Sequence, residues 1–365
     1  MKTLFNLITL SVLVSLLGGC ASLPDWAVSP GRVNHYELQK KVKEHEMFWQ
    51  SLPNPNDYPR EKLEIIGHGV GSYRHYPMRV NEKDFPEGNK ATAKNIAYLM
   101  DTAFSSEHIN AIELDALPPS TSHDLCKGER AEQKSCSFIM HDEPDWTLIN
   151  KSSTPKSLKY MKNNSVSAAL NHFVDRGYHK KGKLMYLELK CNTTKKKCAD
   201  DAVRIFNDIK NIISNNKAEE NKRNWLTITS FFPEALKIFQ KEMKKIELDK
   251  KVDYALIAGY DKFYKKALAQ AKGKVPKFDK TIQDFIVTTR WLNRVWFSTR
   301  GIDSAGAVFE GIDKKRGAYC KEHACKGLKY SVSSYDKDWD KFKKILKEDH
   351  PFTSNLVSIM IDVDD

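Results

Sequence analysis

Short apolar runs alternate with longer amphipathic segments along the chain from residue 62 onward. The short runs have the length and residue types of buried strands, and the longer segments have apolar residues at helical spacing. The predicted strands are 63–66, 110–115, 137–141, 184–189, 225–229, 253–258, 294–298 and 355–361. The predicted helices are 90–104, 155–175, 199–214, 233–246, 260–272, 278–290, 303–311 and 336–348. This alternation predicts an α/β fold of parallel strands joined by crossover helices, and eight strands is the number found in a (β/α)8 TIM barrel.

The amino-terminal sequence predicts export and attachment to lipid. Lys2 precedes an apolar run from Leu4 to Leu17, which is short for a membrane span and typical of a targeting segment. The run ends in Leu17-Gly18-Gly19-Cys20, which resembles the bacterial lipobox. That resemblance implies that Cys20 is the lipidated first residue of a protein on the cell envelope, in the outer membrane or on its periplasmic or extracellular face. An ordinary signal peptide with an incidental cysteine is the alternative.

The predicted organisation has three parts. They are a lipoprotein signal peptide (1–19), a lipid-anchored tether with a leading helix (20–60) and a TIM barrel (61–365) that therefore carries an N-terminal helical extension. The length of 365 residues suits one barrel with insertions. The loop 116–136 lacks a helical period and is long enough to be functional.

Apart from Cys20, the cysteines form three couples that are close in sequence. In an exported chain an even number of cysteines at short separations indicates disulfides, and pairing of sequence neighbours is the simplest arrangement. The predicted disulfides are Cys126–Cys136, Cys191–Cys198 and Cys320–Cys325. Zinc binding is the alternative for Cys320-Lys-Glu-His323-Ala-Cys325, although this spacing is not a common zinc pattern.

The net charge of +12 is spread over short basic clusters such as Lys195-Lys196-Lys197 and Lys314-Lys315-Arg316. Such clusters could contact anionic lipid, but solvated helix faces are the favoured interpretation. The chain lacks the alternation of aromatic and basic residues that would indicate nucleic-acid binding. Export from the cytoplasm also argues against such binding. We expect a monomer whose partners are a membrane and a small substrate.

Acidic residues end two of the predicted strands. Glu113 and Asp115 lie two positions apart, so on a strand their carboxylates point the same way, and Glu188 ends another strand. At the carboxyl ends of barrel strands the three acids would share one rim. Carboxylate oxygens are the ligands that hard divalent cations prefer. The pattern predicts a Mg²⁺ site, with Ca²⁺ as the alternative, formed by these three acids.

Two histidines and a lysine occupy similar positions. His68 lies in a glycine-rich segment directly after the first apolar run, and His141 ends the run 137–141. Imidazoles titrate near neutral pH and can serve as base and acid in a displacement at phosphorus. Lys190, two residues after Glu188, would place a fixed positive charge beside the phosphoryl oxygens. Together these groups suit metal-assisted attack on a phosphodiester.

These motifs, in this order, resemble the phospholipase-C-like phosphodiesterase superfamily, and within it glycerophosphodiester phosphodiesterases and sphingomyelinase D-like phospholipases. They are Gly67-His68, Ile112-Glu113-Leu114-Asp115, Met140-His141-Asp142 and Glu188-Leu189-Lys190. The resemblance implies a metal-dependent phosphodiesterase with His68 and His141 as catalytic residues. It also implies a metal held by Glu113, Asp115 and Glu188, and a substrate contact from Lys190.

The expected substrate of such an enzyme is a phospholipid, a lysophospholipid or a glycerophosphodiester. The nucleophile is either water, which gives hydrolysis, or a hydroxyl of the substrate, which gives a cyclic phosphate. A phosphoinositide-type phospholipase C shares the order of motifs and is a second enzyme hypothesis. A non-catalytic envelope lipoprotein with the same barrel is the alternative outside catalysis.

Two features resemble the sphingomyelinase D side of the superfamily. One is the loop with Cys126 and Cys136, since that family has a disulfide-tied loop between the equivalent elements. The other is the segment 294–298, which resembles a late strand with an aromatic residue at the site. Trp296 would then contact a choline-like headgroup by cation–π attraction, or it belongs to the barrel core.

Three departures leave the subfamily open. Gly69 stands where glycerophosphodiesterases usually have arginine, and Glu188 stands where the sphingomyelinase D family usually has aspartate. The 45 positions from His68 to Glu113 exceed the usual spacing, which predicts an insertion at the rim within 72–90.

Overall fold

The structure, a computed structural model, describes ten segments of the chain. They are residues 64–67, 95–105, 109–118, 137–139, 165–190, 195–216, 223–258, 280–298, 302–335 and 356–362. The predicted signal peptide, the lipidated Cys20 and the leading helix lie outside these segments. Within the segments, no helix combines the length and the apolar character needed to span a bilayer.

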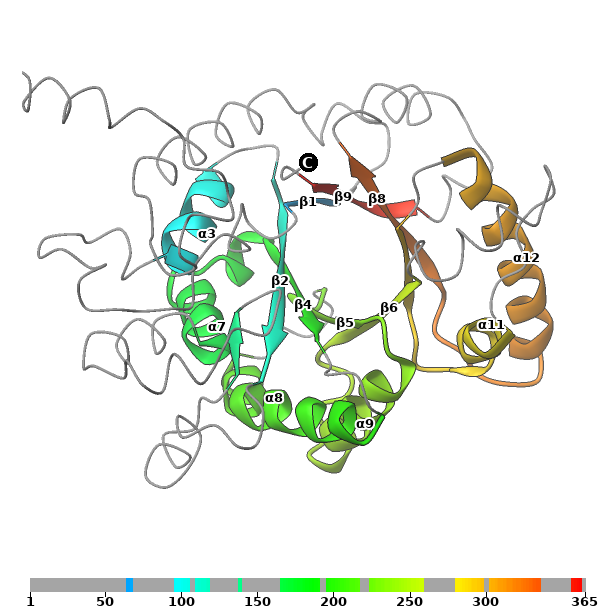
Figure 1. The fold of residues 1–365 in the computed structure, drawn as a ribbon, viewed down its shortest axis with the longest axis horizontal. Coiled ribbons are helices and arrows are strands. Elements are labelled where there is room, and N and C mark those ends of the chain that lie inside the picture. Colours follow the sequence, from blue (N-terminus) through cyan, green and yellow to red (C-terminus); the bar gives the residue numbers. More distant parts are fainter. Residues whose placement is uncertain are drawn as a thin grey trace, which may run out of the picture.

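Eight parallel strands pair edge to edge in a circuit that returns to its starting strand (Figure 1). These eight strands are β1 (Glu64–Gly67), β2 (Ala111–Leu117), β4 (Leu184–Leu189), β5 (Leu226–Ser230), β6 (Asp253–Ala258), β7 (Arg294–Ser298), β8 (Lys329–Tyr335) and β9 (Leu356–Asp362), and a ninth strand is β3 (Phe138–Ile139). β1 pairs with β9 and with β2, and the circuit continues from β2 through β4 to β8. β3 is outside the circuit and pairs antiparallel with the end of β2.

Helices lie on the outer side of the strand circuit (Figure 1). They are α3 (Asn95–Ser105), α7 (Val166–Asp175), α8 (Lys195–Asn215), α9 (Pro233–Lys245), α11 (Lys280–Thr288) and α12 (Ile302–Cys320), with a short 3-10 helix η7 (His179–Lys181). In α9, Pro233 begins the helix, where a missing N–H has no cost. Its residues Ala235, Leu236, Phe239 and Met243 follow helical spacing and are all buried.

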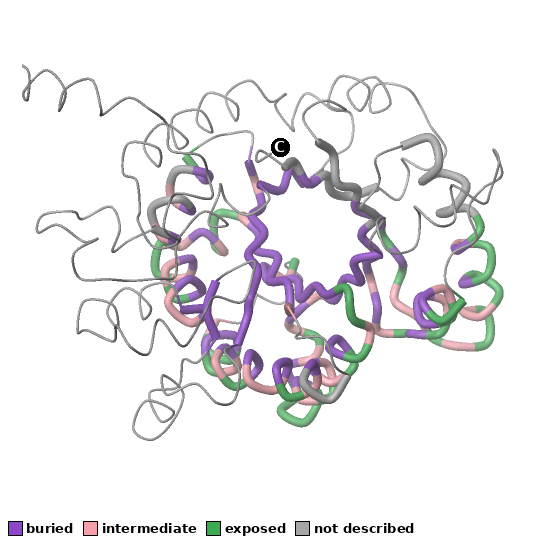
Figure 2. Tube along the Cα trace, viewed as in Figure 1, coloured by how far each residue is buried: buried purple, intermediate pink, exposed green. Residues whose placement is uncertain are grey.

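The buried apolar residues of the described segments include two clusters. The larger lies between the strands and the helices and includes Ile112 on β2 and Phe239 on α9. The smaller lies inside the strand circuit and consists of Ile66, Ala111, Leu184, Tyr186, Ile257, Trp296 and Met360. The strands β1, β2, β4 and β5 are therefore buried on both faces (Figure 2), which explains why most of them are nearly continuous apolar runs in the sequence.

The α/β fold with a parallel sheet agrees with the sequence prediction. The segments that form the parallel strands differ from the predicted ones at two places. The prediction that 137–141 supplies one of the parallel strands was wrong, because Phe138–Ile139 runs antiparallel to β2. β8 takes the missing place in the set and was not predicted. Its sequence, KYSVSSY, is too rich in serine to give an apolar run. Ser331 is nevertheless fully buried, because β7 and β9 pair with β8 on its two edges.

The structure contains one of the predicted disulfides in full. Cys320, the last residue of α12, is bonded to Cys325, so these two sulfur atoms are not zinc ligands. Cys198 in α8 is also disulfide-bonded. Its predicted partner Cys191 and the predicted pair Cys126–Cys136 lie outside the described segments.

Candidate metal centre

Two neighbouring strands carry the three predicted acidic ligands. Glu113 and Asp115 lie on β2, Glu188 lies on β4, and the parallel register places Asp115 beside Glu188. Because side chains alternate across a strand, the intervening residues Leu114 and Leu187 pack toward the helices, in the larger apolar cluster. The acids therefore point into the strand circuit. Asp115 and Glu188 lie in the carboxyl-terminal half of their strands.

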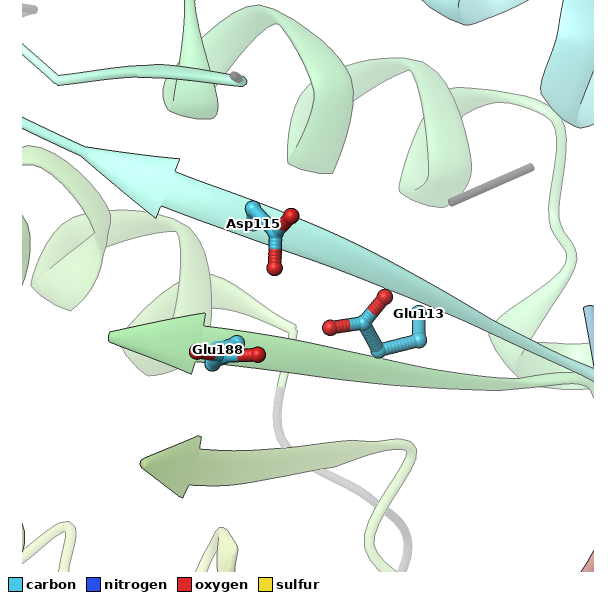
Figure 3. A group of neighbouring side chains, drawn as sticks. All are labelled: Glu113, Asp115 and Glu188. Atoms are coloured by element: carbon cyan, nitrogen blue, oxygen red, sulfur yellow. The ribbon is translucent and has the colours of Figure 1, made fainter. Parts of the chain in front are cut away.

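The three carboxyl groups converge, as the sequence predicted (Figure 3). One oxygen atom from each of Glu113, Asp115 and Glu188 lies within 4.8 Å of the corresponding atoms of the other two. Glu113 and Asp115 are 0% exposed and Glu188 is 3% exposed. Among the residues that the structure describes, this is the one cluster of acidic, histidine or cysteine side chains close enough to hold a metal ion. Its burial distinguishes it from ordinary acidic groups on a surface.

Burial and mutual repulsion favour the protonated forms of these acids. Burial raises the pKa of Glu113 well above 4.5, and the charges of Asp115 and Glu188 add to the rise. Burial also raises the pKa of Glu188 to about 7, although Lys190 opposes the rise. The buried position thus destabilises the ionised carboxylates relative to their protonated forms, and a bound cation would stabilise the ionised forms.

Lys190 places one positive charge against the cluster. Its Nζ lies 2.8 Å from Glu188 Oε1 and 3.2 Å from Asp115 Oδ1. Burial by itself lowers the pKa of Lys190, but the charges of Glu188 and Asp115 outweigh burial and raise it above its usual value. The backbone N–H of Lys190 donates a 3.0 Å hydrogen bond to the carbonyl of Ala116, so both strands position this residue. Lys190 is therefore a fixed cation at the ends of β2 and β4.

The charges and donor atoms of the cluster fit a divalent cation. Three ionised carboxylates and one ammonium carry a net charge of −2 (−3 + 1), which one divalent cation balances. The donor set consists of oxygen atoms alone, which suits hard cations such as Mg²⁺ or Ca²⁺ and is unlike the sulfur and imidazole sets of zinc sites. The cluster is therefore a candidate metal centre.

Aromatic side chains fill the strand circuit next to the acids. Trp296 is fully buried, and its ring packs edge-on against Tyr186 with 5.4 Å between centroids. Tyr186 is two residues before Glu188 on β4 and pairs with Glu113 in the strand register, so its ring lies level with Glu113 and on the amino-terminal side of Asp115 and Glu188. Trp296 has the core position that was one of its two predicted roles, and its contact with a headgroup stays a prediction.

The predicted catalytic histidines lie outside the described segments, but the strand ends that precede them are described. β1 ends at Gly67, one residue before His68, and pairs with the beginning of β2. β3 ends at Ile139, two residues before His141, and pairs with the end of β2. Because β4 pairs along the other edge of β2, both strand ends border the same edge of the strand that carries Glu113. The roles of the two histidines stay predictions.

Sequence reasoning did not single out Phe231, whose ring adjoins the candidate metal centre. The ammonium of Lys190 lies 5.6 Å from the centroid of this ring. The signal in the sequence was Ser230-Phe231-Phe232-Pro233, which puts two aromatic residues directly between a predicted strand and a predicted helix. Adjacent exposed apolar residues can belong to a binding surface, which is how this signal could have been used.

Comparison with known proteins does not assign the chain to a family. Neither the protein-family models nor the curated proteins that were searched include a match to this chain.

Proposed function

We propose that this chain is an exported, lipid-anchored, metal-dependent phosphodiesterase on a complete (β/α)8 barrel. The observation that carries the proposal is the buried convergence of Glu113, Asp115 and Glu188 with Lys190 on two adjacent parallel strands, where Asp115, Glu188 and Lys190 lie toward the carboxyl ends. Active sites of (β/α)8 enzymes lie at this end of the strands. The closed circuit of eight parallel strands with outer helices supports the barrel.

Glu113, Asp115 and Glu188 would hold Mg²⁺ or Ca²⁺. When bound, such an ion polarises a phosphoryl oxygen and offsets negative charge that develops during displacement at phosphorus. The three carboxylates would fix the position of this ion relative to the strand ends. Because the acids are buried and belong to two paired strands, little reorganisation is needed when a substrate binds.

Lys190 would bind the phosphodiester directly. Its ammonium reaches two of the acids and retains partial exposure, with 19% of the side chain accessible. A phosphate oxygen on the accessible side would receive a charge-assisted hydrogen bond from Nζ. Lys190 therefore orients the phosphate and excludes neutral esters, which offer the ammonium no negative charge.

His68 and His141 are the proposed acid and base. One imidazole would take the proton from the attacking oxygen, and the other would donate a proton to the departing oxygen. Their support is the sequence resemblance together with the strand ends at Gly67 and Ile139, which border one edge of β2. The attacking oxygen belongs to water or to a hydroxyl of the substrate.

The proposed substrates are phospholipids, lysophospholipids and glycerophosphodiesters, because the lipobox-like Cys20 would hold the enzyme at a membrane. A panel of glycerophosphocholine, lysophosphatidylcholine, sphingomyelin and phosphatidylinositol, each with and without chelator, tests the reaction. Activity on at least one diester that chelator abolishes is expected. A folded protein that cleaves none of them would favour a non-catalytic envelope lipoprotein.

Metal binding provides a test that does not depend on choosing the right substrate. A ligand that binds only the folded state raises the free energy of unfolding, by about 2.7 kcal/mol at a hundredfold excess over its Kd. We expect Mg²⁺ or Ca²⁺ to raise the melting temperature, and we expect Glu113→Gln to remove this increase.

Glu234→Gln is the matched control, since Glu234 is an exposed acid on α9 and should leave the metal effect intact. A melting temperature that neither cation changes, or an increase that persists in Glu113→Gln, would contradict the proposed metal centre.

A further inference from the structure

An exposed aromatic pair, Phe231 and Phe232, lies at the same end of the strands as the candidate metal centre. The two side chains are 39% and 37% exposed, and Ile246 is the one other large apolar residue with comparable exposure in the described segments. Phe231 follows the last residue of β5, which pairs with β4 beside Glu188. Phe231 therefore lies two residues after Thr229, the residue that pairs with Glu188 across the two strands.

Lys190 links the aromatic pair to the acids by direct contacts. Its ammonium lies 2.8 Å from Glu188 Oε1 and 5.6 Å from the centroid of the Phe231 ring. A phosphate bound at this ammonium would therefore lie within a few ångströms of an exposed ring. A group attached to that phosphate could extend over the ring without leaving the protein surface.

The hydroxyl of Ser230 fixes the backbone that carries the aromatic pair. Ser230 Oγ donates a 2.9 Å hydrogen bond to the carbonyl of Leu189 and accepts a 3.1 Å bond from the N–H of Phe232. Pro233 then begins α9, so the connection between β5 and α9 consists only of Phe231 and Phe232. The rings are presented by a fixed turn, and their position relative to Lys190 is set by β4 and β5.

An aromatic residue occupies the N-cap position of α9, where it cannot cap the helix. Phe232 is the N-cap of α9 and makes no side-chain hydrogen bond to the helix, although serine, threonine, aspartate or asparagine usually fills this position. The buried face of α9 consists of other residues, so the exposed surface of the rings does not complete the core. Local rules are broken in this way most often at functional sites.

We propose that the aromatic pair binds the hydrocarbon chain of a single-chain phosphodiester lipid and so directs the enzyme toward lysophospholipids over glycerophosphodiesters. This inference rests on the proposed phosphodiesterase function. A quaternary ammonium headgroup fits less well, because Lys190 already lies over the Phe231 ring and a second cation there would be repelled. A neutral chain meets no such repulsion and removes apolar ring surface from water.

The test measures kcat/KM of the full chain, kept soluble with an amphipathic polymer, on glycerophosphocholine and on butanoyl, hexanoyl and octanoyl lysophosphatidylcholine. These short-chain lipids remain monomeric at assay concentrations. For the wild type, kcat/KM should rise by up to about fourfold for each methylene group that the rings cover. In Phe231→Ala/Phe232→Ala, the ratio of octanoyl to glycerophosphocholine kcat/KM should fall by about tenfold or more.

Two further variants separate the proposal from its rivals. Phe231→Leu/Phe232→Leu keeps apolar surface without a ring face, so it should retain most of the chain-length dependence. Ile246→Ala removes an equally exposed apolar side chain at the far end of α9, about 20 Å away at 1.5 Å per residue, and should leave the ratio unchanged. An alanine variant with the wild-type ratio, or a leucine variant as impaired as the alanine one, would overturn the proposal.

A binding measurement distinguishes failure of the inference from failure of the proposed function. Calorimetric titration compares octylphosphocholine with phosphocholine in the wild type and in Phe231→Ala/Phe232→Ala. If no diester is cleaved but octylphosphocholine binds more tightly and only in the wild type, the chain site stands and the enzyme proposal fails. If diesters are cleaved but chain length affects neither binding nor kcat/KM, the enzyme proposal stands and the chain site is rejected.

Discussion

At Glu188, burial and charge act in opposite directions on one carboxyl group. Burial favours its neutral form, the ammonium of Lys190 2.8 Å away favours the ionised form, and burial prevails. The resulting pKa of about 7 places the change of charge within the physiological range. A metal ion would have to displace protons from this cluster, so cation binding should strengthen as the pH rises toward 7.

The raised pKa of Glu188 also predicts how stability depends on pH in the metal-free protein. Between pH 4.5 and about 7 the folded protein keeps a proton on Glu188 that the unfolded chain releases. The folded state therefore binds more protons in this window, and the free energy of unfolding falls as the pH rises. The loss is about 3 kcal/mol, the equivalent of raising a pKa from 4.5 to about 7, and is complete above pH 7.

Urea denaturation in chelator at pH 5, 6, 7 and 8 measures this fall. Glu188→Gln cannot ionise, so its free energy of unfolding should change less with pH than that of the wild type. The exposed Glu234→Gln should follow the wild type. Parallel pH profiles for the wild type and Glu188→Gln would show that Glu188 titrates normally in the folded protein.

At the scale of elements, α12 stabilises the end of its neighbour α11 with one buried side chain. The carbonyls at the carboxyl end of a helix have no partner within it. Arg316 of α12 is 4% exposed and donates through Nη1 to the carbonyls of Ile286 and Thr289. Through Nη2 it donates to the carbonyls of Leu292 and Lys326 at 2.9 and 3.1 Å. One guanidinium thus joins α11, α12 and the segment before β7.

Arg316→Met should lower the free energy of unfolding by about 3 kcal/mol, because it keeps much of the side-chain volume but leaves buried carbonyls without donors. Chemical denaturation measures the change. The adjacent Lys315→Met is the control, since Lys315 is exposed, contacts only the side chain of Gln283 among the interactions described, and should change stability by about 0.5 kcal/mol or less. Equal effects of the two substitutions would contradict the bridging role of Arg316.

At the scale of the whole molecule, a buried ionic network joins strands that are far apart in sequence. Glu64, the first residue of β1, accepts a 2.9 Å hydrogen bond from Arg294 of β7, and it is also paired with Arg223 and with the hydroxyl of Tyr186. Glu64 and Arg294 are both 1% exposed. The inside of the strand circuit therefore contains two charged groups, the Glu64 network and the candidate metal centre. The rings of Tyr186 and Trp296 also lie inside the circuit.

Glu64→Gln should lower the free energy of unfolding by about 3–5 kcal/mol, because Arg294 would remain buried without its counter-charge. Combining Glu64→Gln with Arg294→Met removes both charges, so the double variant should be less destabilised than the sum of the single variants, as a denaturation cycle would measure. Glu242→Gln breaks the surface pair with Lys245 and should cost about 1 kcal/mol or less. Additive effects of the two interior substitutions would show that Glu64 and Arg294 do not stabilise the circuit as a pair.

Local pattern was enough to predict most strands and the centre of the site. The apolar runs that form β2 and β4 are visible in the sequence because both faces of these strands are buried. The spacing of Glu113 and Asp115 fixes their common direction wherever a strand forms, and Glu188 with Lys190 ends the next parallel strand. These predictions needed only the two-residue period of a strand and the common edge at which parallel strands end.

Pairing between distant segments decided the rest. The serine-rich Lys329–Tyr335 forms a strand because β7 and β9 pair with it on both edges, and Phe138–Ile139 runs antiparallel to β2 although its own sequence resembles any short strand. The partners of Glu64, the core position of Trp296 and the contact of Lys190 with Phe231 depend likewise on residues that tertiary structure brings together. A short stretch of sequence sets which face a side chain occupies, whereas the identity of its neighbours depends on strand order, which no local pattern contains.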